Sequence, residues 1–345
     1  MSTNVPAHLA SRVIPTHMTA LVATSHDGVA GLRVSRVPVP APKKGQVLVR
    51  MHAAPCNPAD ILYLEGRYGI DRPLPATPGF EGSGVVVASG GGLLGRWLLG
   101  KRVACGGHDC SGTWAEYCLC DASACLPLDK HVTLDQGAAA LANPVTALAL
   151  VATMRAAGHT AYVQTAAAGQ LGKMILAAAT EAGMVGVHVV RRADQAAALR
   201  ALGADHVVVS TDADFEAQLA AKAAAIGATV ALDAIAGDMT GTLVAALPME
   251  SEVIVYGALS GAPSGGIDPM KLAFGHKRVL GFEVAAYLAD AGLFRSFRIA
   301  TAAQKRVRAG AFATTVVGQV PLADASTRLP DYLARMSDGK ILLVP

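Results

Sequence analysis

The sequence predicts a two-domain α/β protein, in which a small, mostly β domain precedes a doubly wound parallel sheet. The 345 residues are long for one compact core and sufficient for two domains. The first third is rich in glycine and proline and carries short β-like runs, whereas from about Asn143 apolar strands alternate with alanine-rich helices. Alternation of continuously apolar strands with helices indicates a parallel sheet covered on both faces.

Short apolar runs separated by turn residues predict strands in the first third, at 46–51, 84–88 and 102–105. The second part contains six apolar strands with helices between the first five, which matches a doubly wound fold. The expected strands are 161–165, 185–190, 206–209, 229–233, 252–256 and 279–283, and the expected helices include 173–182, 195–202 and 215–225. A strand at 314–320, a helix at 322–336 and a strand at 341–344 are expected to return to the first domain.

Composition excludes several classes of protein. Hydrophobic residues make up 52% of the chain, which offers enough apolar surface to offset the entropy of ordering and excludes a disordered chain. The net charge of +3 is too small to indicate a nucleic-acid partner. No stretch offers the roughly 20 apolar residues of a spanning helix, and residues 1–18 lack the apolar segment of a signal peptide. We therefore expect a cytoplasmic protein without a membrane partner.

The cysteines lie at positions 56, 105, 110, 118, 120 and 125. Zinc ribbons use paired C-x2-C units, and this sequence contains none, so we expect no metal site. Cys118 and Cys120 are expected on one face of a strand. The expected state of all six is a reduced, structural thiol, as in the cytosol.

A glycine motif follows the strand at 161–165. Residues 166–172 read AAAGQLG, which gives the pattern A-x-G-x-x-G from Ala167. The second glycine position lets backbone approach a pyrophosphate, and the last permits close packing of helix on strand. A helix N-terminus would supply N–H groups and a partial positive charge for the phosphates. The expected cofactor contacts in this motif are Ala167, Gly169, Gln170, Leu171 and Gly172.

The end of the second strand indicates which dinucleotide binds. Enzymes specific for NAD usually place an acidic residue there, whereas this chain has Arg191 and Arg192. Guanidinium groups suit a 2′-phosphate, so we expect NADP(H); the alternative is that both arginines are solvated strand ends. Asp194 is expected to cap the following helix.

Several motifs together resemble the medium-chain dehydrogenase/reductase superfamily over essentially the whole length. They are NPAD at 57–60, PGFEGSG at 78–84, GTWAEY at 112–117, the glycine motif, LGAD at 202–205 and GKI at 339–341. The resemblance implies a GroES-like catalytic domain at 1–142, completed by 285–345, and an NADP-binding Rossmann domain at 143–284. It also implies a homodimer joined at the last strand of the sheet, 279–283.

The zinc ligands of the alcohol dehydrogenases in this superfamily are missing. Their positions hold Asn57, Phe80 and Ala142, and Cys56 would need a local shift to serve as a ligand. Without a Lewis acid to polarise an alcohol oxygen, alcohol dehydrogenation is disfavoured. The resemblance therefore implies the zinc-free, NADP-dependent branch.

Residues 53–61, 65–69 and 142–147 look like the mitochondrial-type 2-enoyl thioester reductases. This resemblance implies reduction of activated C=C bonds in trans-2-enoyl thioesters, with hydride delivered to the β-carbon and a proton supplied by Tyr68. A phenol with a pKa of about 10 is protonated at neutral pH and suits this role; the alternative is that Tyr68 only lines the cleft or packs a loop through its ring. The runner-up function is NADPH:quinone oxidoreductase. A non-enzymatic nucleotide-binding role is disfavoured by Gly169, Gly172 and Arg191.

The resemblance also assigns residues around the nicotinamide. Asn57 positions the nicotinamide or substrate, or else stabilises a loop, and Asn143 and Thr146 approach the nicotinamide, unless Thr146 serves the start of a helix. Further expected cofactor contacts are Tyr256, Gly257 and Lys340, for which an ordinary surface lysine is the alternative.

Two departures concern the family pattern and the acyl pocket. Phe80 stands where the enoyl reductases carry Asn, and Glu283 stands where they often carry Trp, so Glu283 would alter the mouth of the pocket. Candidate lining residues are Phe274, Phe282 and Tyr287, with core packing favoured for the two phenylalanines. The sequence does not indicate the acyl chain length, the carrier or the pathway.

Overall fold

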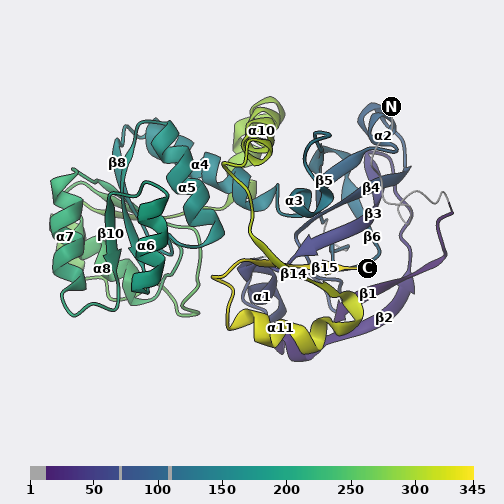
Figure 1. Ribbon diagram of the computed structural model, residues 1–345, viewed down its shortest axis with the longest axis horizontal. Helices are drawn as coiled ribbons and strands as arrows, with labels where there is room; N and C mark the ends of the chain where they lie inside the picture. The colour runs from purple at the N-terminus through teal and green to yellow at the C-terminus, as the bar shows by residue number, and fades with distance from the viewer. Residues whose placement is uncertain (1–12, 70–71, 108–110) are drawn as a thin grey trace. The chain divides into compact units, whose positions relative to one another are not determined.

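The computed structural model describes residues 13–69, 72–107 and 111–345 (Figure 1). The chain divides into two compact units, one formed by Met1–Ala142 with Ala300–Pro345 and the other by Asn143–Ile299. The second division falls inside helix α10 (Val284–Arg308), whereas the sequence-based limit lies at residue 284. Among the described helices, none is long and apolar enough to cross a membrane.

The first unit is built mainly of β-strands. Its main sheet has the order β14-β15-β3-β4-β5-β7, with β6 paired to β3, and β1 and β2 form a separate antiparallel pair. The strands are β1 (His17–Ala23), β2 (Leu32–Pro38), β3 (Gln46–Pro55), β4 (Glu81–Ser89), β5 (Arg102–Gly106), β6 (Tyr117–Asp121), β7 (Cys125–Pro127), β14 (Val316–Pro321) and β15 (Lys340–Val344). The helices are α1 (Pro58–Leu64), α2 (Leu93–Leu98), α3 (Leu134–Ala138) and α11 (Ala325–Leu333).

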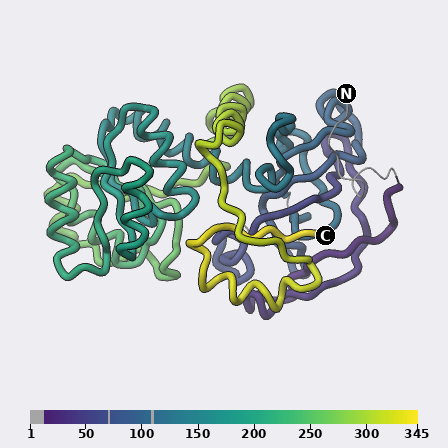
Figure 2. The backbone as a smooth tube through the Cα atoms, viewed as in Figure 1, coloured from purple at the N-terminus to yellow at the C-terminus, as the bar shows by residue number. Residues whose placement is uncertain are grey.

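The C-terminal segment of the chain completes the first unit (Figure 2). Strand β15 pairs antiparallel with β3, so that Leu342 lies opposite Pro55. This pairing extends β3 to Pro55, beyond the predicted end at residue 51, because hydrogen bonds to a partner strand override the weak β preference of an Ala-Ala-Pro segment. The helix predicted at 322–336 is instead a 3₁₀ turn followed by α11, which ends at Leu333.

The second unit is a six-stranded parallel sheet with the order β10-β9-β8-β11-β12-β13. This order, 3-2-1-4-5-6 in chain sequence, confirms the predicted doubly wound fold. The strands are β8 (Ala161–Gln164), β9 (Val185–Val190), β10 (His206–Val209), β11 (Val230–Asp233), β12 (Glu252–Val255) and β13 (Arg278–Gly281). The helices besides α10 are α4 (Ala142–Ala156), α5 (Gln170–Glu181), α6 (Ala193–Ala201), α7 (Phe215–Ala225), α8 (Asp238–Ala246) and α9 (Pro269–Phe274). The strand order reverses between β8 and β11, and ligands of such sheets bind at the carboxyl ends of strands beside this point.

Candidate active site

The turn from β8 to α5 has the geometry of a phosphate-binding loop. Gly169 is the N-cap of α5, in an extended conformation, so the helix begins at Gln170 rather than at the expected Lys173. A Cβ on Gly172 would lie 2.5 Å from the carbonyl oxygen of Ala167, and only glycine permits this close packing. The first-turn amides of a helix lack intrahelical acceptors, so this turn suits a pyrophosphate.

Sequence reasoning missed the unusual backbone of Ala166, which has a φ of 49°. A left-handed conformation costs a residue with a Cβ about 1–2 kcal/mol. The neighbouring Ala167 is fully buried, and its N–H donates to the carbonyl oxygen of Val189 at 3.1 Å. This bond to β9 holds the turn in place. The sequence carries no signal for it, because alanine does not favour the left-handed region.

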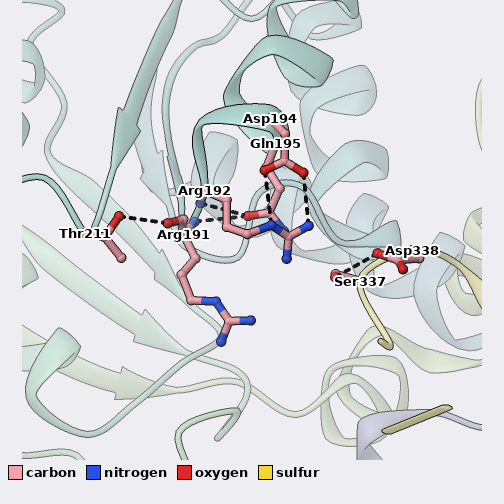
Figure 3. Close-up of polar contacts among 7 residues, drawn as sticks. All are labelled: Arg191, Arg192, Asp194, Gln195, Thr211, Ser337 and Asp338. Carbon is pink, nitrogen blue, oxygen red and sulfur yellow. Dashed lines mark hydrogen bonds and ion pairs between the residues drawn. The ribbon is translucent and has the colours of Figure 1, made fainter. Parts of the chain in front are cut away.

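The two arginines after β9 have different surroundings (Figure 3). The guanidinium of Arg192 donates to both carboxylate oxygens of Asp194, at 3.1 and 3.2 Å. The side-chain oxygen of Gln195 accepts from the backbone N–H groups of Arg191 and Arg192. Among the described residues, no hydrogen bond or ion pair joins the guanidinium of Arg191, which extends away from this group. Arg191 is therefore the arginine whose guanidinium fork is available to a 2′-phosphate.

The expectation that Asp194 caps α6 is wrong. Arg192 occupies the N-cap position, and Asp194 lies in the first turn of the helix. Burial there is slight, and the pKa of Asp194 is lowered by its hydrogen bond from Arg192. An exposed pair of this kind contributes little to stability. The pair matters for the site, because the Asp194 carboxylate binds the guanidinium of Arg192, one of the two arginines expected to bind a 2′-phosphate.

A buried aspartate orders the loop after β11, and sequence reasoning missed it. Asp233 is fully buried and accepts from the hydroxyl of Thr240 at 2.7 Å and from the backbone N–H groups of Ile235 and Ala236. The sequence signal for this role is that Asp233 is an acidic residue at the end of an apolar strand, β11. Hydrogen bonds from backbone amides fix the loop at the carboxyl edge of the sheet.

Tyr256 and Gly257 follow β12 at the same edge. The backbone N–H of Tyr256 donates to the carbonyl oxygen of Asp233 at 2.9 Å. Burial, with the nearby Asp233 charge, raises the pKa of the Tyr256 phenol, so it stays protonated. A Cβ on Gly257 would lie 2.8 Å from the carbonyl oxygen of Ala234, which requires glycine. Both positions fit a cofactor that approaches backbone closely, and their contact with it stays a prediction.

Asn143 and Thr146 lie in the first turns of α4 and are half-buried. The structure places both on one helix, and their approach to a nicotinamide stays a prediction.

In the first unit, the side-chain amide of Asn57 is held from both sides. Its Nδ2 donates to Glu81 Oε1 at 2.9 Å, and its Oδ1 accepts from the ammonium of Lys340. A carboxylate only accepts and an ammonium only donates, so the amide has one orientation. The alternative that Lys340 is a surface residue is wrong, since it is 5% exposed. A direct contact between Lys340 and a cofactor stays a prediction.

Glu81 links Asn57 to the start of α4. Its second carboxylate oxygen accepts from the backbone N–H groups of Leu141 and Ala142, at 3.3 and 2.8 Å. Glu81 is 1% exposed, and burial raises its pKa. Sequence reasoning did not select Glu81, although it stands in the PGFEGSG motif. One buried carboxylate thus orients a candidate site residue and caps a helix.

Asp60 adds a second buried carboxyl group to this cluster. It accepts from the backbone N–H groups of Asn57 and Phe80 at 2.7 and 3.0 Å. Burial raises its pKa to about 7 and lowers the pKa of Lys340. The cluster therefore contains two carboxyl groups, of Asp60 and Glu81, and one ammonium group, of Lys340. Because the pKa of Asp60 is about 7, the cluster gains or loses a proton near neutral pH.

The cluster predicts a pH dependence of stability. The unfolded chain ionises Asp60 near pH 3.8, whereas the folded chain retains the proton to about pH 7. The free energy of unfolding should therefore fall as pH rises through this window, by at most about 1.4 kcal/mol per pH unit. Urea unfolding between pH 4.5 and 7.5 measures it, and Asp60→Asn should flatten the slope. An unchanged slope in that variant would contradict the assignment.

Tyr68 belongs to an aromatic cluster. Its ring centroid lies 4.9 Å from that of Phe80, and Phe80 in turn contacts Tyr63 at 5.9 Å. The guanidinium of Arg72 lies over the Phe80 ring at 5.1 Å. Tyr68 is only half-buried, so its ring packs on Phe80 while the residue keeps access to solvent. Its role as proton donor stays a prediction.

One expectation about the acyl pocket needs correction, and the effect of Glu283 on the pocket mouth stays a prediction. Phe274 is 72% exposed, so core packing is wrong for this residue. The carboxylate of Glu283 accepts from the backbone N–H groups of Ala285 and Ala286, at 2.8 and 2.6 Å. Glu283 therefore satisfies the free amides at the start of α10. Phe282 and Tyr287 contact each other, with ring centroids 5.7 Å apart.

Comparisons with known proteins identify the family. The model of the alcohol dehydrogenase GroES-like domain matches residues 43–130, and that of the zinc-binding dehydrogenases matches residues 171–292. Prostaglandin reductase-3 of Mus musculus is 30% identical over 279 residues, covering 75% of this chain and 68% of the relative. The chain belongs to the medium-chain dehydrogenase/reductase superfamily. Its residues at the zinc-ligand positions place it in the zinc-free branch.

Relatives within this superfamily are named for each of the two predicted activities, enoyl thioester reduction and quinone reduction. Mitochondrial enoyl-[acyl-carrier-protein] reductase of Arabidopsis thaliana is 30% identical over 207 residues, covering 57% of this chain. That alignment spans about half of the relative, 54%. A solved structure from Mesorhizobium loti, a candidate NADPH:quinone reductase, is 34% identical with a TM-score of 0.89, covering 96% of this chain and all of that one. A mycobacterial structure in complex with NADPH is 25% identical with a TM-score of 0.81, covering 95% of this chain. The family is one of NADPH-binding oxidoreductases.

The different surroundings of the two arginines predict unequal effects on cofactor preference. Arg191→Ser should raise the KM for NADPH by about 10- to 100-fold, the loss of one or two charge-assisted hydrogen bonds, and leave the KM for NADH unchanged. Arg192→Ser, the matched control, should change either constant by less than about threefold, because its guanidinium is engaged by Asp194. Equal effects in both variants would contradict the assignment.

Proposed function

We propose that this protein is an NADPH-dependent reductase of activated C=C bonds, with trans-2-enoyl thioesters as its substrates and the cytoplasm as its location. The observation that carries the proposal is the Asn57 amide, fixed by Glu81 and Lys340 at a position where the alcohol dehydrogenases carry a zinc ligand. The ring of Tyr68 packs on Phe80, which occupies a second ligand position. The chain therefore presents an oriented amide and a phenol where the zinc enzymes present a Lewis acid.

Each group has a defined task in this reaction. NADPH supplies the hydride when it is bound. An amide NH2 has two N–H groups, and Glu81 accepts one of them, so the second N–H of Asn57 can orient a carbonyl or carboxamide group. The neutral phenol of Tyr68 donates its proton to the α-carbon as the enolate collapses. Arg191 binds the 2′-phosphate, and the first turn of α5 binds the pyrophosphate.

The second candidate is an NADPH:quinone oxidoreductase, which is favoured by the 34% identity to the Mesorhizobium loti structure. Hydride transfer to a conjugated ring needs no proton at a carbon atom, so Tyr68 would be dispensable. The test is oxidation of NADPH at 340 nm with crotonyl-CoA and, in parallel, with a simple quinone, using NADH as the control. Turnover of the thioester supports the proposal. Turnover of the quinone alone would contradict it and support the quinone oxidoreductase activity.

We further propose that two copies join at β13. This strand is the edge of the parallel sheet, and its Leu280 is 40% exposed. Unpaired backbone groups on an edge strand can pair with a second copy of the same strand. The backbone N–H groups of Arg278 and Phe282 donate inward to β12, so that of Val279, one position on, faces the free edge. Light scattering after size exclusion should give a dimer, and Val279→Pro should shift it to a monomer by removing this edge N–H. A wild-type monomer at micromolar concentration would contradict the proposal.

A further inference from the structure

Four cysteines share one core in the first unit. Cys105, Cys118, Cys120 and Cys125 are buried in a single cluster with side chains of β3 and β4, and all four are free thiols. Cys118 and Cys120 lie on the same face of β6, as predicted, with sulfur atoms 3.6 Å apart. Among the described residues, no group of three or more potential ligands is arranged to hold a metal ion. Cys110 lies outside the described residues.

The strand register brings one pair of these thiols face to face. Cys105 on β5 lies directly opposite Cys125 on β7 in an antiparallel pair. The backbone N–H of Leu128 donates to the carbonyl oxygen of Arg102, so these two residues form a hydrogen-bonded pair. Because the two kinds of pair alternate along the ladder, Cys105 and Cys125 form a non-hydrogen-bonded pair, whose Cα atoms lie about 4.5 Å apart. That separation is within the range that disulfides span.

Cys120 also has hydrogen bonds with Cys105, Cys118 and Cys125. Its strand β6 pairs with β3 and not with β5 or β7, so no register between the described strands sets Cys120 opposite Cys105 or Cys125. The pair formed by Cys118 and Cys120 is also less suited to a bond. Cys118 and Cys120 are two residues apart along one extended strand, which places their Cα atoms roughly 6.8 Å apart. This distance is at the upper limit for a disulfide, about 6.8 Å. Joining them would require β6 to distort and to break its pairing with β3. The cross-strand pair therefore needs less rearrangement.

Access to oxidants also favours the cross-strand pair. Cys125 lies on β7, a three-residue strand at the edge of the sheet, and it is 6% exposed whereas the other three are fully buried. A hydrogen bond with Cys120 lowers the pKa of Cys105, but burial and the neighbouring thiols raise it to about 11. Cys105 is thus a protonated thiol that does not react first. Local opening of the short strand β7 would expose Cys125.

We propose that Cys105 and Cys125 are an oxidisable dithiol, which a small hydroperoxide converts into a disulfide across β5 and β7. The Cys125 thiolate attacks the peroxide O–O bond, giving a sulfenic acid and releasing an alcohol or water. Cys105 then attacks this sulfur, forming the S–S bond and releasing water. Overall, two thiols and one hydroperoxide give one disulfide, water and the alcohol, and a thiol reductant reverses the change.

The disulfide would brace a segment that contacts the candidate site. The closed loop contains Thr113, whose hydroxyl donates to the carbonyl oxygen of Glu81 at 2.8 Å, and Trp114, whose indole donates to that of Pro55. A cross-link restricts the unfolded chain and raises stability if the native geometry accepts it. Oxidation should therefore raise the Tm, and reduction should restore it.

The pairing is tested by peptide mapping of the full-length, folded protein. Trypsin leaves residues 103–130 as one peptide, because no lysine or arginine lies between them, and cleavage after Glu116 separates Cys105 from Cys118, Cys120 and Cys125. After treatment with tert-butyl hydroperoxide and alkylation, a Cys110→Ser protein should give a linked pair of fragments with Cys118 and Cys120 alkylated. The link should persist in Cys118→Ala and disappear in Cys125→Ala.

Each of these outcomes would overturn the proposal: a bond from Cys120 to Cys118 or Cys105, an intermolecular bond, sulfinic acid as the main product, or full alkylation of unchanged thiols. If Cys125→Ala fails to fold, the fragment masses and the Tm shift of the Cys110→Ser protein decide the question alone.

Discussion

Tyr68→Phe should lower kcat for crotonyl-CoA reduction by about 10²- to 10⁴-fold, the usual contribution of a general acid. The ring contact with Phe80 would remain, so stability and the KM for NADPH should be unchanged. Stopped-flow measurement of NADPH oxidation gives kcat, and thermal unfolding checks the fold. Tyr63→Phe, which removes a hydroxyl from the same aromatic cluster, is the matched control and should retain activity.

The outcome with a quinone separates the two candidate functions. If the enzyme reduces enoyl thioesters with Tyr68 as donor, the variant loses only that activity. Full retention of thioester turnover in Tyr68→Phe would show that the proton has another source, and Tyr68 would then be a packing residue.

Lys340→Met should destabilise the protein by about 3–5 kcal/mol, the usual cost of removing one partner from a buried ionic cluster. Glu81 and Asp60 are 1% and 0% exposed and would lose their common counter-ion. Urea unfolding measures the change at pH 8, which is above the pKa of about 7 of Asp60. Lys44→Met, at an exposed position, should change stability by less than about 0.5 kcal/mol.

A second substitution distinguishes lost charge balance from lost packing. Glu81→Gln in the Lys340→Met background removes one of the unbalanced charges and should recover part of the stability, since the cluster then carries a single acid. An additive, larger loss in the double variant would show that the two side chains act independently and would contradict the charge argument.

The fold of the second unit was predictable because its strands are continuously apolar. The bounds of β9 and β10 agree with the predicted ones, and buried strands in a parallel sheet leave little ambiguity in sequence. The first unit was less predictable, since β3 extends to Pro55 through pairing with β15. That partner lies nearly 300 residues away in the chain, beyond the reach of local patterns.

The turn at Gly172 and the exposed position of Arg191 were predictable, because a tight turn requires glycine and a charged residue that ends an apolar strand faces solvent. Their contact with a cofactor stays a prediction. The sequence could not show that Asp194 engages Arg192, or that Lys340 meets Asn57 inside the first unit. These contacts depend on side-chain packing between distant segments, for which no local pattern exists.

The most direct test of the proposed activity is the fate of a labelled hydride. NADPH carrying deuterium at the transferable position of the nicotinamide would be incubated with crotonyl-CoA, and the product examined by mass spectrometry and NMR. We expect butyryl-CoA with one deuterium at the β-carbon and a solvent-derived hydrogen at the α-carbon. Deuterium at the α-carbon, or recovery of unreduced crotonyl-CoA while a quinone is turned over, would contradict it.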